Sequence, residues 1–189
     1  MIQNVVSTAE LGANIDLSLI AQNLWNIQYN PRKFTAAIIR VRKPATTSLL
    51  FSSGKFVCTG GKSIEDNKKG ARIIARKIQK FYGRFLPMKK IYFRNFTVQN
   101  VVGSFKFRHK VDLIALNLAM PKQTRYDSII FPGLQFNPNP REKTTILIFI
   151  SGKIIITGIK DPAIIEELKT YLNRLLIKFI RPFPYISLL

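Results

Sequence analysis

The chain has 189 residues, 47% of them hydrophobic, which is enough to bury a substantial core. Thirty lysines and arginines against ten aspartates and glutamates give a net charge of +20, which favours a polyanionic partner, nucleic acid ahead of a membrane surface. One cysteine and one histidine exclude an internal disulfide and a zinc site with four Cys/His ligands, and no apolar run approaches the roughly 20 residues of a membrane span. We expect a soluble, intracellular protein; a solvated basic surface without a ligand is the alternative to an anionic partner.

The second half of the chain repeats the first. Asn4-Val5-Val6 recurs as Asn100-Val101-Val102, an offset of 96 residues, and Ser53-Gly54-Lys55 recurs as Ser151-Gly152-Lys153, an offset of 98. Two copies of one long unit predict a domain with pseudo-twofold symmetry, whereas a solenoid would repeat about every 20–50 residues. We expect the first repeat at residues 1–90 and the second at residues 91–189, packed as one domain.

The first predicted helix begins after Asn14 or Asp16, because either side chain can accept hydrogen bonds from the free N–H groups of a first helical turn. Apolar residues then recur at the spacing of one helix face, and they are Leu17, Ile20, Ala21 and Leu24. We expect this face to be buried and Trp25 to extend it.

An apolar hairpin follows in each repeat, and alternation along its strands separates two faces. One face of the first hairpin carries Thr47, Leu49, Phe51, Val57 and Thr59, opposite Ser48, Leu50, Phe56 and Cys58. The second hairpin sets Thr145, Leu147, Phe149, Ile155 and Thr157 against Ile146, Ile148, Ile150, Ile154 and Ile156. Helices can cover only one of these faces, so the other is expected to be an apolar, threonine-bearing binding surface. Its burial as a second core, by dimerisation or by extra helices, is the alternative.

A longer helix is predicted after each hairpin. Ser63 to Asp66 has the form of a capping box, and the helix it opens has Ile74, Ile78 and Phe81 on its apolar side. The remaining sides carry Lys68, Lys69, Arg72, Arg76, Lys77 and Lys80. This basic surface either binds acidic regulators or is only solvated. In the second repeat Asp161-Pro162 opens the matching helix, whose apolar positions are Ile165, Leu168, Leu172, Leu175 and Phe179.

A flattened DNA minor groove suits an apolar face with a basic rim. Its floor offers few distinctive donors and acceptors, its walls are sugars, and phosphates line its edges. Apolar side chains can pack on sugars and base edges, Thr and Asn can hydrogen-bond to base acceptors, and phenylalanines at the ends can wedge between base steps.

Several ordered segments resemble the C-terminal core of the TATA-box-binding protein (TBP) family. They are Gln3 to Thr8, Tyr29 to Phe34, Thr46 to Lys55, Val98 to Ser104, Phe131 to Leu134 and Leu147 to Lys153. The resemblance extends from Asn4 to about Phe179. It implies an α+β fold in which the two repeats form a saddle, a curved antiparallel sheet whose concave side sits on DNA and whose convex side carries the helices.

The resemblance also implies roles for individual residues. Phe34 with Phe51 and Phe131 with Phe149 would be the intercalating pairs. The minor-groove contacts would be Asn4, Val6, Leu49, Val57, Thr59, Asn100, Val102, Leu147, Ile155 and Thr157. The phosphate contacts would be Arg40, Lys55, Lys62, Lys153 and Lys160, and the partner contacts Arg72, Arg76, Lys77 and Asp127.

The implied function is that of a nuclear general transcription initiation factor, which binds A/T-rich double-stranded DNA, bends it by phenylalanine intercalation and nucleates the preinitiation complex. Its partners would be transcription factors IIA and IIB, or IIB-related factors, and TBP-associated factors or regulators, with no membrane. It would act on DNA as a monomer, with a free dimer left open. The alternatives are a TBP-related factor that has weak or altered DNA specificity and acts mainly through protein partners and, from another class, a dimeric scaffold. The Tyr126 to Phe131 loop keeps one acidic residue, Asp127, where the family usually has two, which weakens the expectation of a IIB contact.

Catalysis is not expected. Gly60-Gly61-Lys62-Ser63 resembles a phosphate-binding loop, but Phe56 occupies the position of the required first glycine. A lone histidine and few, scattered acidic residues offer no nucleophile–base set, no carboxylate pair and no metal site. We therefore expect no cofactor.

Overall fold

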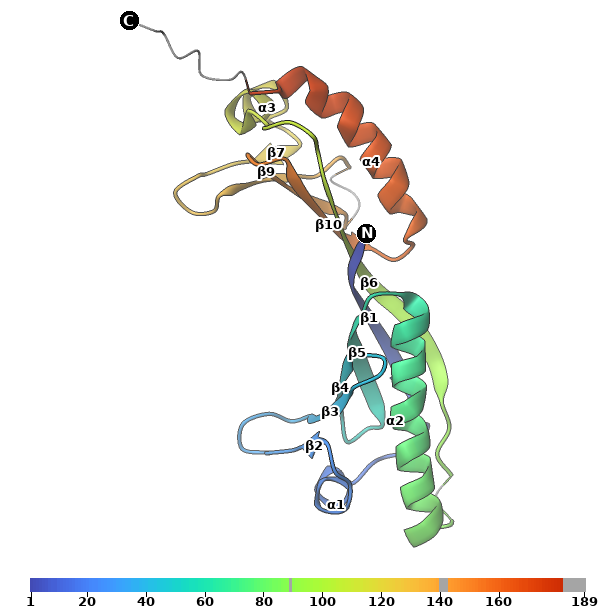
Figure 1. Ribbon diagram of the computed structural model, residues 1–189. Helices are drawn as coiled ribbons and strands as arrows, with labels where there is room; N and C mark the ends of the chain where they lie inside the picture. The colour runs from blue at the N-terminus through green and yellow to red at the C-terminus, as the bar shows by residue number, and fades with distance from the viewer. Residues whose placement is uncertain (89, 140–142, 182–189) are drawn as a thin grey trace, which may run out of the picture. The chain divides into compact units, whose positions relative to one another are not determined.

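The computed structural model describes residues 1–88, 90–139 and 143–181 (Figure 1). They form two compact units. The N-terminal unit comprises Ile2 to Val101, and the C-terminal unit comprises Met1 and the residues from Val102 onward. The repeat boundary expected between residues 90 and 91 stays a prediction, and residues 89, 140–142 and 182–189 of the predicted repeats lie outside the described residues.

The N-terminal unit begins with strand β1 and ends within strand β6. Its elements are β1 (Ile2–Glu10), α1 (Leu17–Asn23), β2 (Ile27–Gln28), β3 (Ala37–Val41), β4 (Thr46–Leu50), β5 (Lys55–Gly61), α2 (Ile64–Phe85) and the first part of β6 (Arg94–Lys106). Strand β6 continues into the C-terminal unit. The elements there are α3 (Leu113–Ala119), β7 (Thr124–Arg125), β8 (Gly133–Phe136), β9 (Thr145–Phe149), β10 (Lys153–Ile159), α4 (Ala163–Leu176) and the 3₁₀ turn η1 (Ile177–Phe179).

The strands are hydrogen-bonded in the order β2-β3-β4-β5-β1-β6-β10-β9-β8-β7. The two halves of this order match: a short edge strand (β2 or β7) is followed by one further strand (β3 or β8), the two hairpin strands and a long strand (β1 or β6). Neighbours such as β4 and β5, or β9 and β10, run antiparallel. This arrangement agrees with the repeat found in the sequence.

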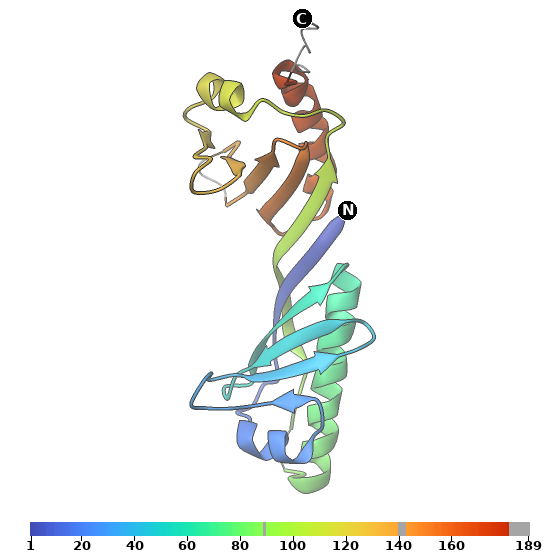
Figure 2. The same ribbon diagram turned by 60° about the vertical axis from the view of Figure 1, so that its left-hand side comes forward.

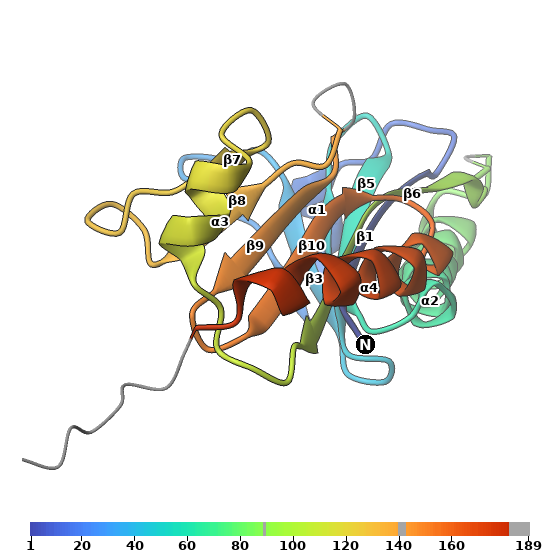
Figure 3. The ribbon, with the colours of Figure 1, turned by 90° about the horizontal axis from the view of Figure 1, so that it is seen from above.

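Helix α2 lies along one face of the sheet in the N-terminal unit (Figure 2). Its buried residues Ile74, Ile78 and Phe81 join the core beneath it, as predicted, together with Phe56 and Leu50 from the sheet. In the C-terminal unit α4 lies along β9 and β10 (Figure 3), with Ile165 and Leu172 buried. Helices thus cover one face of each sheet.

Capping bonds confirm the predicted starts of α1 and α2. The Asp16 carboxylate accepts from the Leu19 N–H at 2.9 Å, and the Ser63 hydroxyl accepts from the Asp66 N–H at 3.0 Å. The start predicted for α4 was one residue early: Pro162 is the N-cap and the helix begins at Ala163, whose N–H donates to the Asp161 carboxylate at 2.9 Å. Each side chain satisfies a backbone donor that the first turn of a helix leaves free.

Three other local expectations were wrong. Trp25 does not extend the buried stripe of α1, since the helix ends at Asn23 and Trp25 is 73% exposed. Ile150 lies in the turn after β9 and is exposed, because the strand ends one residue earlier. Helix α4 ends at Leu176, so Phe179 belongs to the 3₁₀ turn instead of the helix.

The hairpin turns require glycine in both units. Gly54 and Gly152 have φ of +82° and +81°, a conformation that residues with a Cβ atom rarely adopt. A Cβ atom on Gly152 would also lie 2.6 Å from the Phe107 carbonyl oxygen.

Within the part of the chain described by the structure, no helix combines the length and the apolarity needed to cross a bilayer.

Candidate nucleic-acid interface

The face of the N-terminal sheet opposite α2 is only half-buried, and we call it the N-terminal open face. Burial alternates along each strand, so that Leu49 and Val57 are half-buried while their neighbours Leu50 and Phe56 are at most 1% exposed. The strand register aligns this face into two rows. One row is Ile38, Leu49, Val57 and Thr8, and the other is Arg40, Thr47, Thr59 and Val6. The predicted separation of the two faces is confirmed for this hairpin.

The C-terminal unit repeats the arrangement on its own open face. Leu147 pairs with Gln135 on one side and with Ile155 on the other, and Thr145 pairs with Thr157. These side chains, apart from the exposed Gln135, are half-buried, whereas Ile146, Ile148, Ile154 and Ile156 are fully buried. The alternation predicted for the second hairpin is therefore confirmed as well, except at Ile150.

Asn4 is oriented by two hydrogen bonds at the edge of the N-terminal open face. Its Oδ1 accepts from the Gly60 N–H at 2.8 Å and from the Thr59 hydroxyl at 3.1 Å. A backbone N–H can only donate, so the atom next to Gly60 must be the amide oxygen and not the nitrogen. The Asn4 amide therefore keeps its NH₂ donors for an acceptor outside this pair, and minor-groove base edges are acceptors.

Four phenylalanines lie at the ends of the open faces. Phe34 and Phe131 are 44% and 41% exposed, and Phe51 and Phe149 are half-buried. The Phe131 and Phe149 rings meet edge to face with centroids 5.9 Å apart. Among the described aromatic contacts there is no equivalent pair of Phe34 with Phe51. The structure thus brings together one of the two predicted pairs as a ring contact.

Two equivalent turns hold Phe34 and Phe131. In the N-terminal unit the Asn30 side-chain oxygen accepts from the Arg32 N–H, and the Asn30 carbonyl accepts from the Phe34 N–H at 3.0 Å. In the C-terminal unit the Asp127 carboxylate accepts from the Ile129 N–H at 3.0 Å, and its carbonyl accepts from the Phe131 N–H at 2.9 Å. Each exposed ring therefore follows a hydrogen-bonded turn.

This geometry changes the interpretation of Asp127. The residue was predicted as a partner contact, but its carboxylate also accepts from the Ile130 N–H at 3.4 Å and so serves the loop's own backbone. Asn30 and Asp127 were not predicted to position the phenylalanines. The shared signal was a turn-forming Asn or Asp four residues before each ring.

The predicted phosphate contacts are exposed at the edges of the open faces. Arg40, on β3, donates to the Gln28 side-chain oxygen at 2.7 Å, and Lys55 lies 3.8 Å from the Glu10 carboxylate. The other three, Lys62, Lys153 and Lys160, lie at the ends of β5 and β10 and are exposed. All five remain predictions as phosphate contacts.

The basic surface of α2 contains one lysine that is already engaged. Lys77 donates to the Trp25 carbonyl oxygen at 2.5 Å, its ammonium lies 4.5 Å from the Trp25 ring centroid, and burial lowers its pKa. Arg72 lies over the Phe93 ring, and Arg72 and Arg76 line a cavity of about 420 Å³ with Gln79 and Tyr92. The two arginines are therefore better placed than Lys77 to meet a partner.

Sequence reasoning missed three residues of the N-terminal open face. Thr8 continues the alternation of Asn4 and Val6, and its hydroxyl accepts from the Gln99 side chain at 2.8 Å. Ile38 pairs with Leu49. Period-2 alternation carried past the hairpin would have identified Thr8 and Ile38; Gln99 carried no such signal.

The described residues contain no cluster of three or more His, Cys, Asp or Glu side chains that could hold a metal ion. Cys58 is buried under α2, and burial raises the pKa of its thiol. His109 lies edge to face on Phe107, with centroids 5.6 Å apart.

The chain matches the family model described as "Transcription factor TFIID (or TATA-binding protein, TBP)" over residues 1–81 and 95–179. It is 42% identical over 168 residues to the TATA-box-binding protein of Caenorhabditis elegans, covering 88% of this chain and 47% of that protein. It is 42% identical over 168 residues to the human TATA box-binding protein-like 2, covering 88% of this chain and 46% of that protein. The chain thus spans about half the length of these relatives.

Among solved structures, the chain is similar to that of the Methanococcus jannaschii TBP. The TM-score is 0.76 at 31% identity, over 94% of this chain and 97% of that one. This similarity, together with the strand order, confirms the predicted α+β fold class. The chain belongs to the TATA-binding protein (TBP) family.

Proposed function

We propose that the open faces bind the minor groove of A/T-rich, TATA-like DNA, that the phenylalanines bend the duplex by intercalation, and that the complex nucleates assembly of a preinitiation complex in the nucleus. Membership of the TBP family supports a role in transcription initiation. Partners of the kinds expected for the family, transcription factors IIA and IIB or IIB-related factors and TBP-associated factors, belong to this proposal.

The observation that carries the proposal is the half-buried open face of each unit. Soluble proteins rarely leave an ordered apolar surface uncovered unless it binds something. Here the surface combines Leu49, Val57 and Leu147 with the hydroxyls of Thr59 and Thr157, in rows set by the strand register. Such a surface can pack on sugars, and the NH₂ group of Asn4 at its edge can donate to a groove whose A·T pairs present only acceptors.

The exposed phenylalanines support bending. Phe34 and Phe131 keep 44% and 41% of their surface exposed although each is large and apolar. Unstacking a base step costs a few kcal/mol, which a wedge offsets by allowing more protein surface to contact the bent duplex. Flexible TA steps are therefore the preferred wedge sites.

A bending assay tests the proposal. An A/T-rich duplex carries a donor dye at one end and an acceptor dye at the other. When the protein binds, fluorescence energy transfer between the dyes should report a shorter end-to-end distance. Phe34→Ala and Phe149→Ala should abolish the bend. Phe85→Ala is the matched control, since Phe85 is 56% exposed but lies at the end of α2, away from the open face. An unbent complex with the wild-type chain contradicts the proposal.

A TBP-related factor that works mainly through protein partners is the second candidate. One observation favours it: the turn before Phe131 exposes Ile129 and Ile130 at 95% and 80%, where the equivalent turn carries Arg32 and Lys33. Salt-sensitive DNA binding without a bend would identify this function, because binding through phosphate contacts alone depends steeply on salt.

A further inference from the structure

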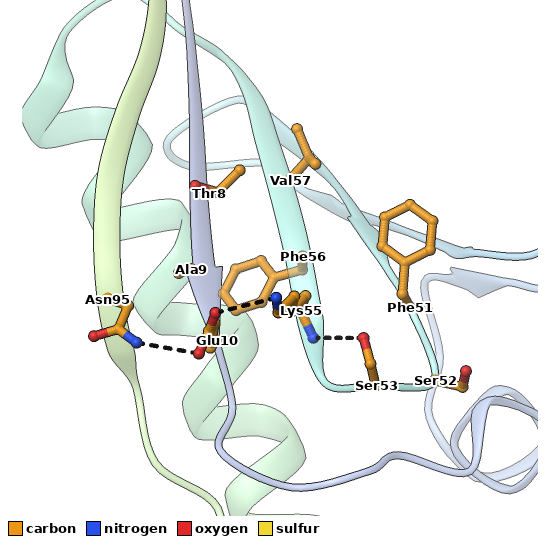
Figure 4. A pocket seen from close by; sticks show the side chains of 10 residues that line it. All are labelled: Thr8, Ala9, Glu10, Phe51, Ser52, Ser53, Lys55, Phe56, Val57 and Asn95. Carbon is orange, nitrogen blue, oxygen red and sulfur yellow. Dashed lines mark hydrogen bonds and ion pairs between the residues drawn. The ribbon is translucent and has the colours of Figure 1, made fainter.

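Glu10 is an acidic residue that lies beside residues proposed to contact DNA. It ends strand β1, and its carboxylate accepts from the Asn95 side chain at 3.1 Å and lies 3.8 Å from the Lys55 ammonium (Figure 4). The same side chains line a cavity of about 560 Å³ together with Phe51 and Val57. Two proposed DNA contacts, Phe51 and Val57, thus share an opening with a carboxylate.

The ion pair is a poor candidate for a stabilising role. The Lys55 and Glu10 side chains are 71% and 36% exposed, and the separation of 3.8 Å is at the long end for an ion pair. Exposed pairs of this kind contribute between zero and about 1 kcal/mol to folding. A carboxylate beside a phosphate-binding site, in contrast, opposes binding of a polyanion directly.

The equivalent corner of the C-terminal unit carries a lysine in place of the acid. At offsets of 96 and 98 residues, Glu10 corresponds to Lys106 and Lys55 to Lys153. One residue further on, the same backbone bond closes both corners: the Leu11 N–H donates to the Gly54 carbonyl at 2.9 Å, and the Phe107 N–H donates to the Gly152 carbonyl at 2.8 Å. An acid and a lysine in one unit are thus replaced by two exposed lysines in the other.

We infer that Glu10 competes with DNA phosphate for Lys55, so that Lys55 contributes less to DNA binding than Lys153. This inference rests on the proposed DNA-binding function. Glu10 is then a specificity-determining residue, because it makes the electrostatic attraction to DNA phosphates weaker in the N-terminal unit than in the C-terminal unit. Binding by the unit with the weaker phosphate contacts depends more on how easily the DNA base step at that unit deforms, because fewer contacts offset the cost of the kink.

A double-mutant cycle tests the inference, with affinity for an A/T-rich duplex measured by fluorescence anisotropy across a salt series. Glu10→Gln should tighten binding several-fold and steepen the salt dependence by about 0.9 in log–log slope, which is one freed phosphate contact. Lys153→Met should weaken binding more than Lys55→Met does. In the Glu10→Gln background, the cost of Lys55→Met should rise to that of Lys153→Met.

Glu65→Gln is the matched control, because it removes the same charge from an exposed position in the first turn of α2. If it tightens binding as much as Glu10→Gln, the effect is only net charge and the inference is overturned. Equal costs of Lys55→Met and Lys153→Met in the wild-type background also overturn it. Absence of DNA binding by the wild-type chain would instead reject the proposed function, and circular dichroism confirms that each variant is folded.

Discussion

Where the first turns of the long helix meet the sheet, the two units use opposite chemistry. At the N-terminal end of α2 the contact is polar: the Asn67 amide nitrogen donates to the Ser7 hydroxyl at 2.8 Å, the Cys58 carbonyl at 2.9 Å and the Val5 carbonyl at 3.1 Å. Its oxygen accepts from the Gly61 N–H at 3.3 Å. Asn67 is completely buried.

Beneath α4 the equivalent contact is apolar. Ile165 stands at the position of Asn67, 98 residues later, and Gly103 at the position of Ser7, 96 residues later. A Cβ atom on Gly103 would lie 2.7 Å from the Ile165 Cδ1, so the larger side chain on the helix needs the smaller residue on the strand. The comparison teaches that the fold fixes the volume at this contact and leaves its polarity free, provided that every buried polar group has a partner.

Replacement of Asn67 should have the largest effect. Asn67→Ile puts the residue of the C-terminal unit into the N-terminal one and leaves the Val5 and Cys58 carbonyls and the Gly61 N–H without their partner. Each of the four lost hydrogen bonds contributes about 1 kcal/mol, so we expect a loss of about 3 kcal/mol or more in the free energy of unfolding. Denaturant titration followed by the fluorescence of the single tryptophan, Trp25, measures it in this unit. Adding Ser7→Gly to the Asn67→Ile variant should recover part of the loss. An Asn67→Ile variant as stable as the wild type would contradict a stabilising role for the Asn67 hydrogen bonds.

Gly70→Ala sharpens the comparison at the next turn of α2. A Cβ atom there would collide with the Thr46 side chain, with Cγ2 at 3.0 Å, so we expect a loss of about 1–3 kcal/mol from overpacking. Gly83→Ala on the same helix is the control, because its Cβ would meet nothing within 4 Å. That change should stabilise the protein by up to about 1 kcal/mol through helix propensity. Equal changes in melting temperature for Gly70→Ala and Gly83→Ala would mean that α2 is not closely packed at Gly70.

The two turns before the exposed phenylalanines should respond alike. Asn30→Ala and Asp127→Ala each remove a side-chain bond to a turn N–H, at a cost of about 1 kcal/mol in local stability. Hydrogen exchange at the Arg32 and Ile129 amides should become faster. Asp127→Asn keeps an accepting oxygen and should leave exchange unchanged; equal acceleration by Asn would show that the carboxylate charge, and not the bond, holds the turn.

The smallest expected effect concerns the reactivity of the Cys58 thiol. Burial raises the pKa of the Cys58 thiol, so the protonated form persists to higher pH than in the unfolded chain and little reactive thiolate is present at neutral pH. Native protein should resist iodoacetamide, with labelling only after unfolding, as measured by mass spectrometry. The Asn67→Ala variant should label faster, since Asn67 accepts from the Cys58 thiol at 3.6 Å. Rapid labelling of the native wild type would contradict the buried position.

Regular patterns were predictable from the sequence and irregular ones were not. Period-2 alternation placed Leu49 and Ile155 on open faces, and capping residues located the starts of α1 and α2, because both signals depend only on neighbours along the chain. The roles of Asn67 and Glu10 depend on strands that the chain brings together from distant positions, for example Asn67 with Val5, 62 residues away. Trp25 was misplaced because apolar spacing says nothing about where a helix ends.

The matched turns at Asn30 and Asp127 have a consequence for how such proteins diversify. Their hydrogen bonds use only the first residue of the turn and the backbone, and involve no side-chain atom of the two residues before each phenylalanine. Arg32 with Lys33 in one unit, and Ile129 with Ile130 in the other, are two solutions at such positions. Mutation can therefore change the side chains exposed at these positions without removing the hydrogen bonds that shape the turn.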